Sequence, residues 1–266
     1  MKIIICIKQV PETIDVRIDP ETNTLIREGV QSIINPFDMY AIEEALRIKE
    51  HMGAEVIVIS MGPSQAESAL REAVGLGADR AVLLSDRAFA GADTLATSYT
   101  LAQAIRKLGD FSLIICGKQA SDGDTAQVGP GISVHLNIPQ ITYVKKIEKI
   151  TKDFIRAQRM TEQGFEIIKA PLPCLLTVVK EINEPRISSL KGMLRAKKAE
   201  ITKWSIKDLD LSPARLGLNG SPTQVIKIFT PSPRKGGEIF TGDFHEAVDK
   251  LVEAVKKDIS ICHPAA

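Results

Sequence analysis

Four short apolar runs, separated by amphipathic stretches, restrict the possible folds of this chain more than any other feature. The runs are KIIICIK at residues 2–8, EVIVIS at 55–60, RAVLL at 80–84 and FSLIICG at 111–117. Isoleucine, valine and leucine occupy successive positions in them, so both faces of each strand would be apolar. That pattern is typical of parallel strands covered on both sides. The runs therefore predict the central strands of an α/β sheet.

Helical patterns lie between these runs. In NPFDMYAIEEALRIKEHMG, Asn35 stands at the N-cap position, Pro36 at the first helical position and Gly53 where a left-handed terminus belongs. Similar amphipathic patterns cover residues 64–77 and 93–109. The alternation predicts a βαβαβαβ order and hence a doubly wound, Rossmann-like parallel sheet with right-handed crossovers.

The pattern changes beyond residue 140. Two alternating segments flank the turn-like TEQG at residues 161–164, and they predict an antiparallel hairpin added to the sheet. Residues 186–242 have many prolines and little periodicity, and only GDFHEAVDKLVEAVKKD near the end is clearly helical. Long irregular segments are uncommon in compact monomers. We therefore expect an α/β domain at 1–185 and an extended C-terminal arm at 186–266 that wraps a partner.

Composition excludes several classes of function. The 34 basic and 33 acidic residues give a formal net charge of +1, so no global field attracts nucleic acid or an anionic membrane. No run reaches 18 apolar residues and the first residues contain no signal cleavage site, so we expect no membrane insertion and a cytoplasmic location. The four cysteines lie far apart without a CxxC pair, which argues against a metal site. No nucleophile and base occur at a telling spacing, so no catalytic side chain is predicted.

The loops that follow the strands are the candidate binding site. In an open parallel sheet, ligands bind beyond the carboxyl ends of the strands. Four loops converge there: KQVPET, MGPS, FAGADT and GKQASDGDTAQVGP. Glycine-rich loops and helix N-termini bind anions through backbone amides, and Thr94 and Thr97 would add hydroxyl donors. Neither GxGxxG after the first strand nor GxxxxGK[ST] is present. The residues alone favour a nucleotide site but leave ordinary turns open.

Five separated motifs carry a resemblance to a known family. CIKQVPET, NPFDMYAIEEALRIKE, MGPSQAESALREAVGLGADRAVLLSD, GKQASDGDTAQVGP and NEPRISSLKGMLRAKK occur in an order that resembles the β subunit of electron transfer flavoproteins. The resemblance implies an adenine nucleotide α-hydrolase-like fold and a heterodimer with an α subunit that carries electrons between dehydrogenases. It implies that Leu190 docks into a partner dehydrogenase and that the β subunit alone is inert.

The same resemblance implies an adenine nucleotide site. The residues that would form it are Cys6, Asn35, Pro36, Phe37, Asp38, Met61, Gly117, Lys118, Gln119, Ala120, Ser121, Asp122, Gly123, Asp124, Thr125, Ala126, Gln127 and Val128. In ordinary members of the family the nucleotide is AMP. In electron-bifurcating members it is a second FAD.

Small side chains indicate which nucleotide to expect. Gly123 and Ala126 stand where ordinary members have bulkier side chains, and DGDTAQVGP and GADTLATS resemble the bifurcating subfamily. In that subfamily FAD takes electrons from NADH and divides them between ferredoxin and, through the FAD of the α subunit, a flavin dehydrogenase of acyl-CoA or lactate type. Thr94 and Thr97 would then contact the pyrophosphate. Two alternatives stay open: an ordinary carrier that binds AMP, and a stand-alone ATP- or AMP-binding module whose arm forms a homodimer.

Overall fold

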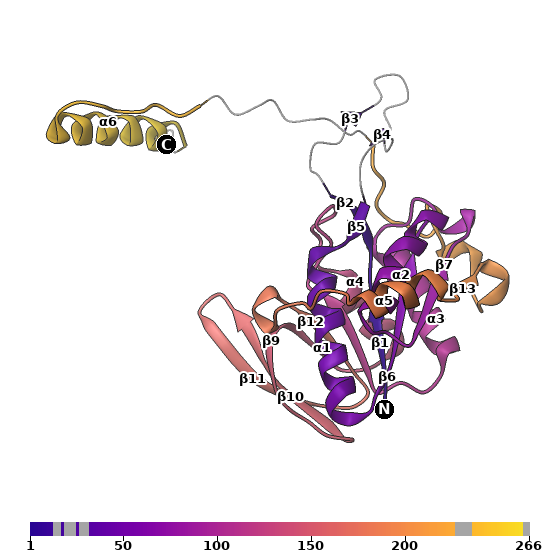
Figure 1. Cartoon of the computed structure of the whole chain (residues 1–266). Coiled ribbons are helices and arrows are strands. Elements are labelled where there is room, and N and C mark those ends of the chain that lie inside the picture. Colours follow the sequence, from indigo (N-terminus) through magenta and orange to yellow (C-terminus); the bar gives the residue numbers. More distant parts are fainter. Residues whose placement is uncertain (13–16, 19–24, 27–31, 227–235, 263–266) are drawn as a thin grey trace. The chain divides into compact units, whose positions relative to one another are not determined.

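The computed structural model describes residues 1–12, 17–18, 25–26, 32–226 and 236–262. Its largest element is a nine-stranded sheet with the order β11-β10-β9-β12-β8-β1-β6-β7-β13 (Figure 1). The strands are β1 (Lys2–Cys6), β6 (Glu55–Met61), β7 (Arg80–Leu84), β8 (Leu113–Gly117), β9 (Gln140–Ile150), β10 (Phe154–Thr161), β11 (Gly164–Pro171), β12 (Cys174–Val178) and β13 (Thr202–Trp204). The seven strands β9, β12, β8, β1, β6, β7 and β13 are neighbours in this order, and each adjacent pair among them is parallel. The order reverses at β1, which confirms the predicted doubly wound sheet.

The described part of the chain contains six α-helices. They are α1 (Pro36–Met52), α2 (Glu67–Leu76), α3 (Thr94–Leu108), α4 (Val128–Leu136), α5 (Leu190–Lys198) and α6 (Phe244–Cys262). Single 3-10 turns are η1 (Ser64–Ala66), η2 (Arg87–Phe89), η3 (Lys180–Ile182), η4 (Ile206–Asp208) and η5 (Pro213–Arg215). Two small ladders join β2 (Gln9–Pro11) to β5 (Ser32–Ile34) and β3 (Arg17–Ile18) to β4 (Leu25–Ile26). The three helices expected in the first half of the chain are confirmed by α1, α2 and α3.

The core explains why the central strands are apolar at successive positions. In β1, Ile3 and Ile5 pack in one apolar cluster with residues of α1 and α2, whereas Ile4 belongs to a second cluster with residues of α3. All three isoleucines are fully buried. Burial of each such side chain contributes about 1.5–3 kcal/mol. Both faces of the sheet are therefore covered, as the sequence predicted for parallel strands.

The antiparallel addition also follows the prediction. β10 pairs antiparallel with β11, and Thr161 stands opposite Gly164 at the turn between them. β10 is also antiparallel to β9, which lies beside the parallel strand β12. The three strands thus form one edge of the sheet, at the lower left in Figure 1.

The chain after residue 186 contains more structure than its sequence pattern indicates. α5 packs on α2, and β13 extends the sheet beside β7. Sequence reasoning missed both elements because β13 has only three residues and the apolar repeat of α5, Leu190, Met193 and Leu194, is confined to little more than one turn. The chain forms two compact units, Met1–Ile228 and Phe229–Ala266. Parts of the expected arm, 227–235 and 263–266, lie outside the described residues.

The second unit contains α6, whose apolar side chains follow one stripe. Phe244, Val248, Leu251, Val252 and Val255 recur at helical spacing and are 39% to 74% exposed. An exposed stripe of this kind is typical of a helix that buries it against another surface. That residues 186–266 wrap a partner stays a prediction.

Candidate nucleotide site

A cavity of about 690 Å³ lies at the carboxyl ends of β1, β6 and β8. Its lining includes these sequence-predicted residues: Cys6, Asn35, Asp38, Met61, Thr94, Thr97, Gly117, Lys118, Gln119, Ala120, Gly123, Thr125, Ala126, Gln127 and Val128. The expected Pro36, Phe37, Ser121, Asp122 and Asp124 are not part of the lining, and Leu190 lies apart from it on α5. The structure thus brings most of the predicted site to one cavity at the predicted edge of the sheet.

The lining also contains residues that the sequence analysis did not name individually. They are Ile7, Lys8, Ala92, Asp93, Leu101, Cys116, Gly129, Thr223 and Val225. Lys8, Ala92, Asp93 and Gly129 belong to the four candidate loops, and Ile7 and Cys116 directly neighbour the predicted Cys6 and Gly117. Thr223 and Val225 come from the proline-rich segment, where the sequence carries no comparable signal.

Asn35 organises the loop between β8 and α4. It occupies the N-cap position of α1, but its side chain does not cap that helix, so the expected cap is wrong. Its Nδ2 instead donates to Gln119 O at 2.8 Å, and its Oδ1 accepts from Ser121 N at 3.0 Å. Because Asn35 is fully buried, these two bonds hold the loop against the start of α1.

The loop is held in an unusual backbone conformation. Asp124 and Ala126 have φ values of 51° and 54°, in the left-handed region that residues other than glycine seldom adopt. Asp124 N donates to Ala120 O at 2.8 Å, and Lys8 Nζ forms an ion pair with Asp122 at 2.7 Å. Strained backbone that surrounding contacts enforce is common at ligand sites. The arrangement is typical of a preorganised binding loop.

Gly117 permits close contact between β8 and α1. A Cβ at this position would overlap the Asp38 carboxylate and lie 2.7 Å from the Phe37 carbonyl carbon. Asp38 is 5% exposed, and its Oδ2 accepts from Lys8 N at 2.7 Å. Burial raises the pKa of Asp38 to about 7, although hydrogen bonds from Lys8, Asn35 and Gly117 oppose this shift. The cavity therefore contains a carboxyl group that titrates near neutral pH.

The raised pKa predicts a measurable pH dependence of stability. Because the pKa of Asp38 is higher in the folded state than in the unfolded state, the folded state binds the proton more tightly. The stability gained from this protonation is fully present below the unfolded pKa of 3.8 and is lost as pH rises to about 7. Asp38→Asn stays neutral throughout. The difference in unfolding free energy between wild type and Asp38→Asn should therefore fall by up to about 4 kcal/mol across this range. Urea unfolding of both proteins at several pH values measures it, and parallel profiles would show that Asp38 ionises normally.

Two helix N-termini border the cavity, and they differ in their capping. At α3, Asp93 Oδ1 accepts from Leu95 N and Ala96 N at 2.9 and 3.1 Å, so a carboxylate already occupies this end. Thr94 Oγ1 also has a partner, since it donates to Gln127 Oε1 at 2.8 Å. A phosphate near this terminus would meet the negative charge of Asp93.

The N-terminus of α4 is open by contrast. Its N-cap residue, Gln127, makes no side-chain capping bond. The N–H groups of Val128 and Gly129 in the first turn have no acceptor within the helix, and both residues line the cavity. Gly123 lies on the same loop, and nothing is within 4 Å of the position its Cβ would take. Open space beside free amides at a positive helix end suits a phosphate or pyrophosphate group.

Comparison with known proteins identifies the family. The model for the electron transfer flavoprotein domain matches residues 22–209, which is more than half of the chain. The chain belongs to the electron transfer flavoprotein family. It is 56% identical to the electron transfer flavoprotein subunit beta of Thermoanaerobacterium thermosaccharolyticum over 95% of this chain and 97% of that protein.

Other relatives of this flavoprotein chain have different names. It is 52% identical to subunit CarD of the caffeyl-CoA reductase-Etf complex of Acetobacterium woodii, over 97% of this chain and 98% of that one. It is 44% identical to protein FixA of Sinorhizobium fredii, over 100% and 95% of the two chains. The predicted resemblance to electron transfer flavoprotein β subunits is thereby confirmed.

Three further features of the flavoprotein chain concern metal binding, membrane spans and cysteines. Within the described ranges, no three His, Cys, Asp or Glu side chains are grouped in a way that could hold a metal ion. Among the helices of the described residues, none combines the length and the apolar character that crossing a bilayer requires. Cys6, Cys116 and Cys174 are buried free thiols.

Proposed function

We propose that this chain is the β subunit of an electron-bifurcating electron transfer flavoprotein and holds FAD in the cavity between β1, β8 and α4. Bound FAD would supply the redox chemistry, taking a hydride from NADH and passing the electrons to ferredoxin and, through the FAD of the α subunit, to a flavin dehydrogenase. The chain itself contributes binding and orientation. A cytoplasmic location and inactivity of the isolated subunit are part of the proposal.

The open N-terminus of α4 is the observation that carries this proposal. Val128 and Gly129, in the first turn of α4, line a cavity in which Gly123 leaves space for a bulky phosphate-containing ligand. Asn35 holds the loop in place, so these groups need no reorganisation on binding. Thr97 lies in the lining and could add a hydroxyl donor, whereas Thr94 would first have to leave Gln127.

The name of one relative guides the choice of partner. CarD is a subunit of a complex named for caffeyl-CoA reductase. We therefore favour a flavin dehydrogenase that acts on CoA thioesters over one of lactate type. Docking of this dehydrogenase on Leu190 fits its position on α5, where the side chain is 74% exposed.

Cofactor analysis of the purified αβ heterodimer tests the proposal. Acid extraction should release about two FAD per heterodimer, and NADH should bleach the flavin absorbance under anaerobic conditions. An ordinary carrier would instead release about one FAD and one AMP, without direct reduction by NADH. A homodimer of this chain without flavin absorbance would favour the stand-alone nucleotide-binding module.

A further inference from the structure

Helix α5 carries the proposed docking residue but is anchored by very little apolar burial. It spans nine residues, Leu190–Lys198, and none of them is buried. Leu190 and Leu194 are 74% and 54% exposed. An isolated helix of this length is unstable in water, and exposed side chains do not fix its position. The contacts on either side of α5 must therefore hold it in place.

Both ends of α5 are in contact with α2. A Cβ on Gly192 would overlap the carbonyl oxygen of Gly75, so the two backbones are in direct contact. Arg71 Nη1 donates to Ala196 O at 3.1 Å and to Ala199 O at 2.8 Å, where the helix ends. A cation at these terminal carbonyls also complements the helix dipole. Helix α5 is thus attached to α2 in its first turn and at its C-terminal end.

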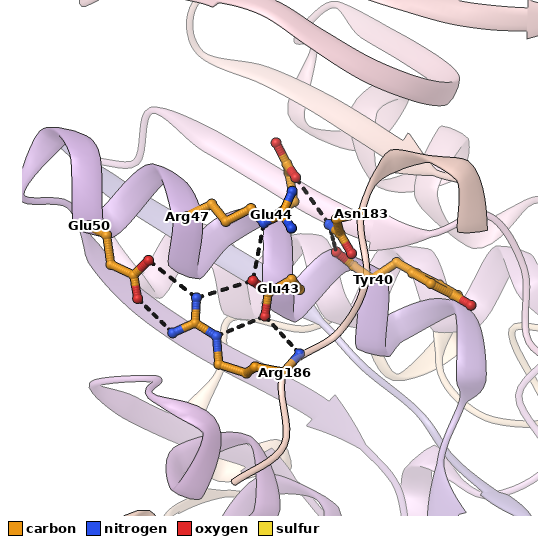
Figure 2. Close-up of polar contacts among 7 residues, drawn as sticks. All are labelled: Tyr40, Glu43, Glu44, Arg47, Glu50, Asn183 and Arg186. Carbon is orange, nitrogen blue, oxygen red and sulfur yellow. Dashed lines mark hydrogen bonds and ion pairs between the residues drawn. The ribbon is translucent and has the colours of Figure 1, made fainter. Parts of the chain in front are cut away.

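The chain leading into α5 is attached to α2 through Ser188, whose Oγ donates to Gly75 O at 3.1 Å, and to α1 chiefly through one guanidinium group. Arg186 Nε and Nη2 donate to the two oxygens of Glu43 at 2.8 and 3.1 Å, and Nη1 and Nη2 donate to the two oxygens of Glu50 at 2.6 and 3.2 Å. Its backbone N–H also donates to Glu43, at 3.1 Å. Figure 2 shows Arg186 between these two carboxylates of α1. Bidentate pairs of this kind fix orientation as well as distance.

A neighbouring contact continues the attachment. Asn183 Nδ2 donates to Tyr40 O and to Glu44 Oε2, both at 3.0 Å (Figure 2). The segment is thereby bound to α1 at two points three residues apart. Residues 187–189, which follow directly, connect it to Leu190.

The carboxylates of Glu43 and Glu50 differ in burial, and this difference indicates which of them holds Arg186 more firmly. The side chain of Glu43 is 6% exposed and that of Glu50 is 54% exposed. Burial alone would raise the pKa of Glu43, but hydrogen bonds and charge from Arg186, with help from Arg47, hold it below its ordinary value. A buried ion pair resists separation because the remaining charge would be left unpaired. The pair with Glu43 is therefore the main attachment, and the pair with Glu50 is accessory.

We propose that Arg186 is a positioning residue for partner docking. By fixing the start of α5 to α1, it keeps Leu190 in the docking position before the dehydrogenase arrives. The role rests on the proposed function, because it presupposes docking at Leu190. When only a fraction of molecules has the docking helix in place, apparent affinity falls by that fraction, while the rate within the docked complex stays the same.

Steady-state kinetics of the αβ heterodimer with a short-chain acyl-CoA dehydrogenase test this role. Arg186→Ala should raise the KM for the dehydrogenase about tenfold with little change in kcat, as expected if about one molecule in ten is competent. Arg186→Lys keeps the positive charge but loses the guanidinium group that bonds both oxygens of a carboxylate, so it should restore only part of the affinity. NADH oxidation with an artificial acceptor should not change. Arg80→Ala, which removes an exposed pair with Glu55, is the matched control and should leave every value unchanged.

A second measurement separates positioning from docking. Amide hydrogen exchange in the free heterodimer should become at least about tenfold faster across α5 in Arg186→Ala, and stay unchanged in Leu190→Ala. Leu190→Ala should still raise the KM. Unchanged exchange in α5 of Arg186→Ala overturns the positioning role, and so does an unchanged KM. An unchanged KM in Leu190→Ala overturns the docking function instead. If Arg186→Ala does not fold, Arg186→Lys weakens the main attachment to Glu43, and it must raise exchange in α5 for the role to stand.

Discussion

Gly123→Asp is expected to lower nucleotide affinity in the cavity by a factor on the order of a thousand while leaving the fold intact. Nothing lies within 4 Å of the position of its Cβ, and its φ is outside the left-handed region, so a side chain meets neither a clash nor strain. The new carboxylate would stand near the proposed phosphates at α4. Like charges about 4 Å apart repel by roughly 4 kcal/mol at an effective dielectric constant of 20. That energy corresponds to the thousandfold loss.

Gly123→Asn is the matched control, because it adds the same volume without charge. FAD content measured by acid extraction should fall from about two to about one per heterodimer in Gly123→Asp and stay near two in Gly123→Asn. Equal loss in both variants would mean that the ligand fills the space beside Gly123, and charge would not be the cause. Retention of both flavins in Gly123→Asp would place the phosphates away from this loop.

The sequence predicted the sheet well because its signals are local. β1, β6, β7 and β8 are apolar at successive positions, and such runs have few alternatives to a buried strand. α5 and β13 could not be predicted in this way. α5 is held by Gly192, Arg71 and Arg186, whose partners lie more than 100 residues away in sequence. Polar contacts at such separation leave no periodicity in the chain.

The location of the candidate site could be predicted from the sequence, but the hydrogen bonds within it could not. The strand-end rule placed the glycine-rich loop at the correct edge of the sheet. It could not indicate that the Asn35 side chain would bind Gln119 and Ser121, because an asparagine before a helix ordinarily caps it. It also could not indicate that Asp93 would occupy the start of α3 and leave α4 as the open terminus. Such competition between acceptors depends on the folded geometry.

Gly117→Ala is expected to destabilise the protein by about 3 kcal/mol, at the upper end of the usual cost of overpacking. The added methyl group would meet the Asp38 carboxylate, the Phe37 carbonyl carbon at 2.7 Å and Asp38 N at 2.8 Å. These atoms belong to the backbone and to a buried side chain of the first turn of α1, so no flexible side-chain end can yield. β8 and α1 must separate instead. The Asn35 bonds to the loop would loosen with them, and nucleotide affinity should fall as well.

Gly123→Ala provides the matched comparison in the same cavity. Its methyl group enters open space, so its stability should stay within about 0.5 kcal/mol of wild type or rise slightly through the reduced entropy of the unfolded chain. Thermal unfolding should show Gly117→Ala roughly 10 °C below wild type and Gly123→Ala near it. Similar melting temperatures for both variants would mean that α1 can shift at little cost. The close approach of Gly117 to Asp38 would then not be what fixes the floor of the site.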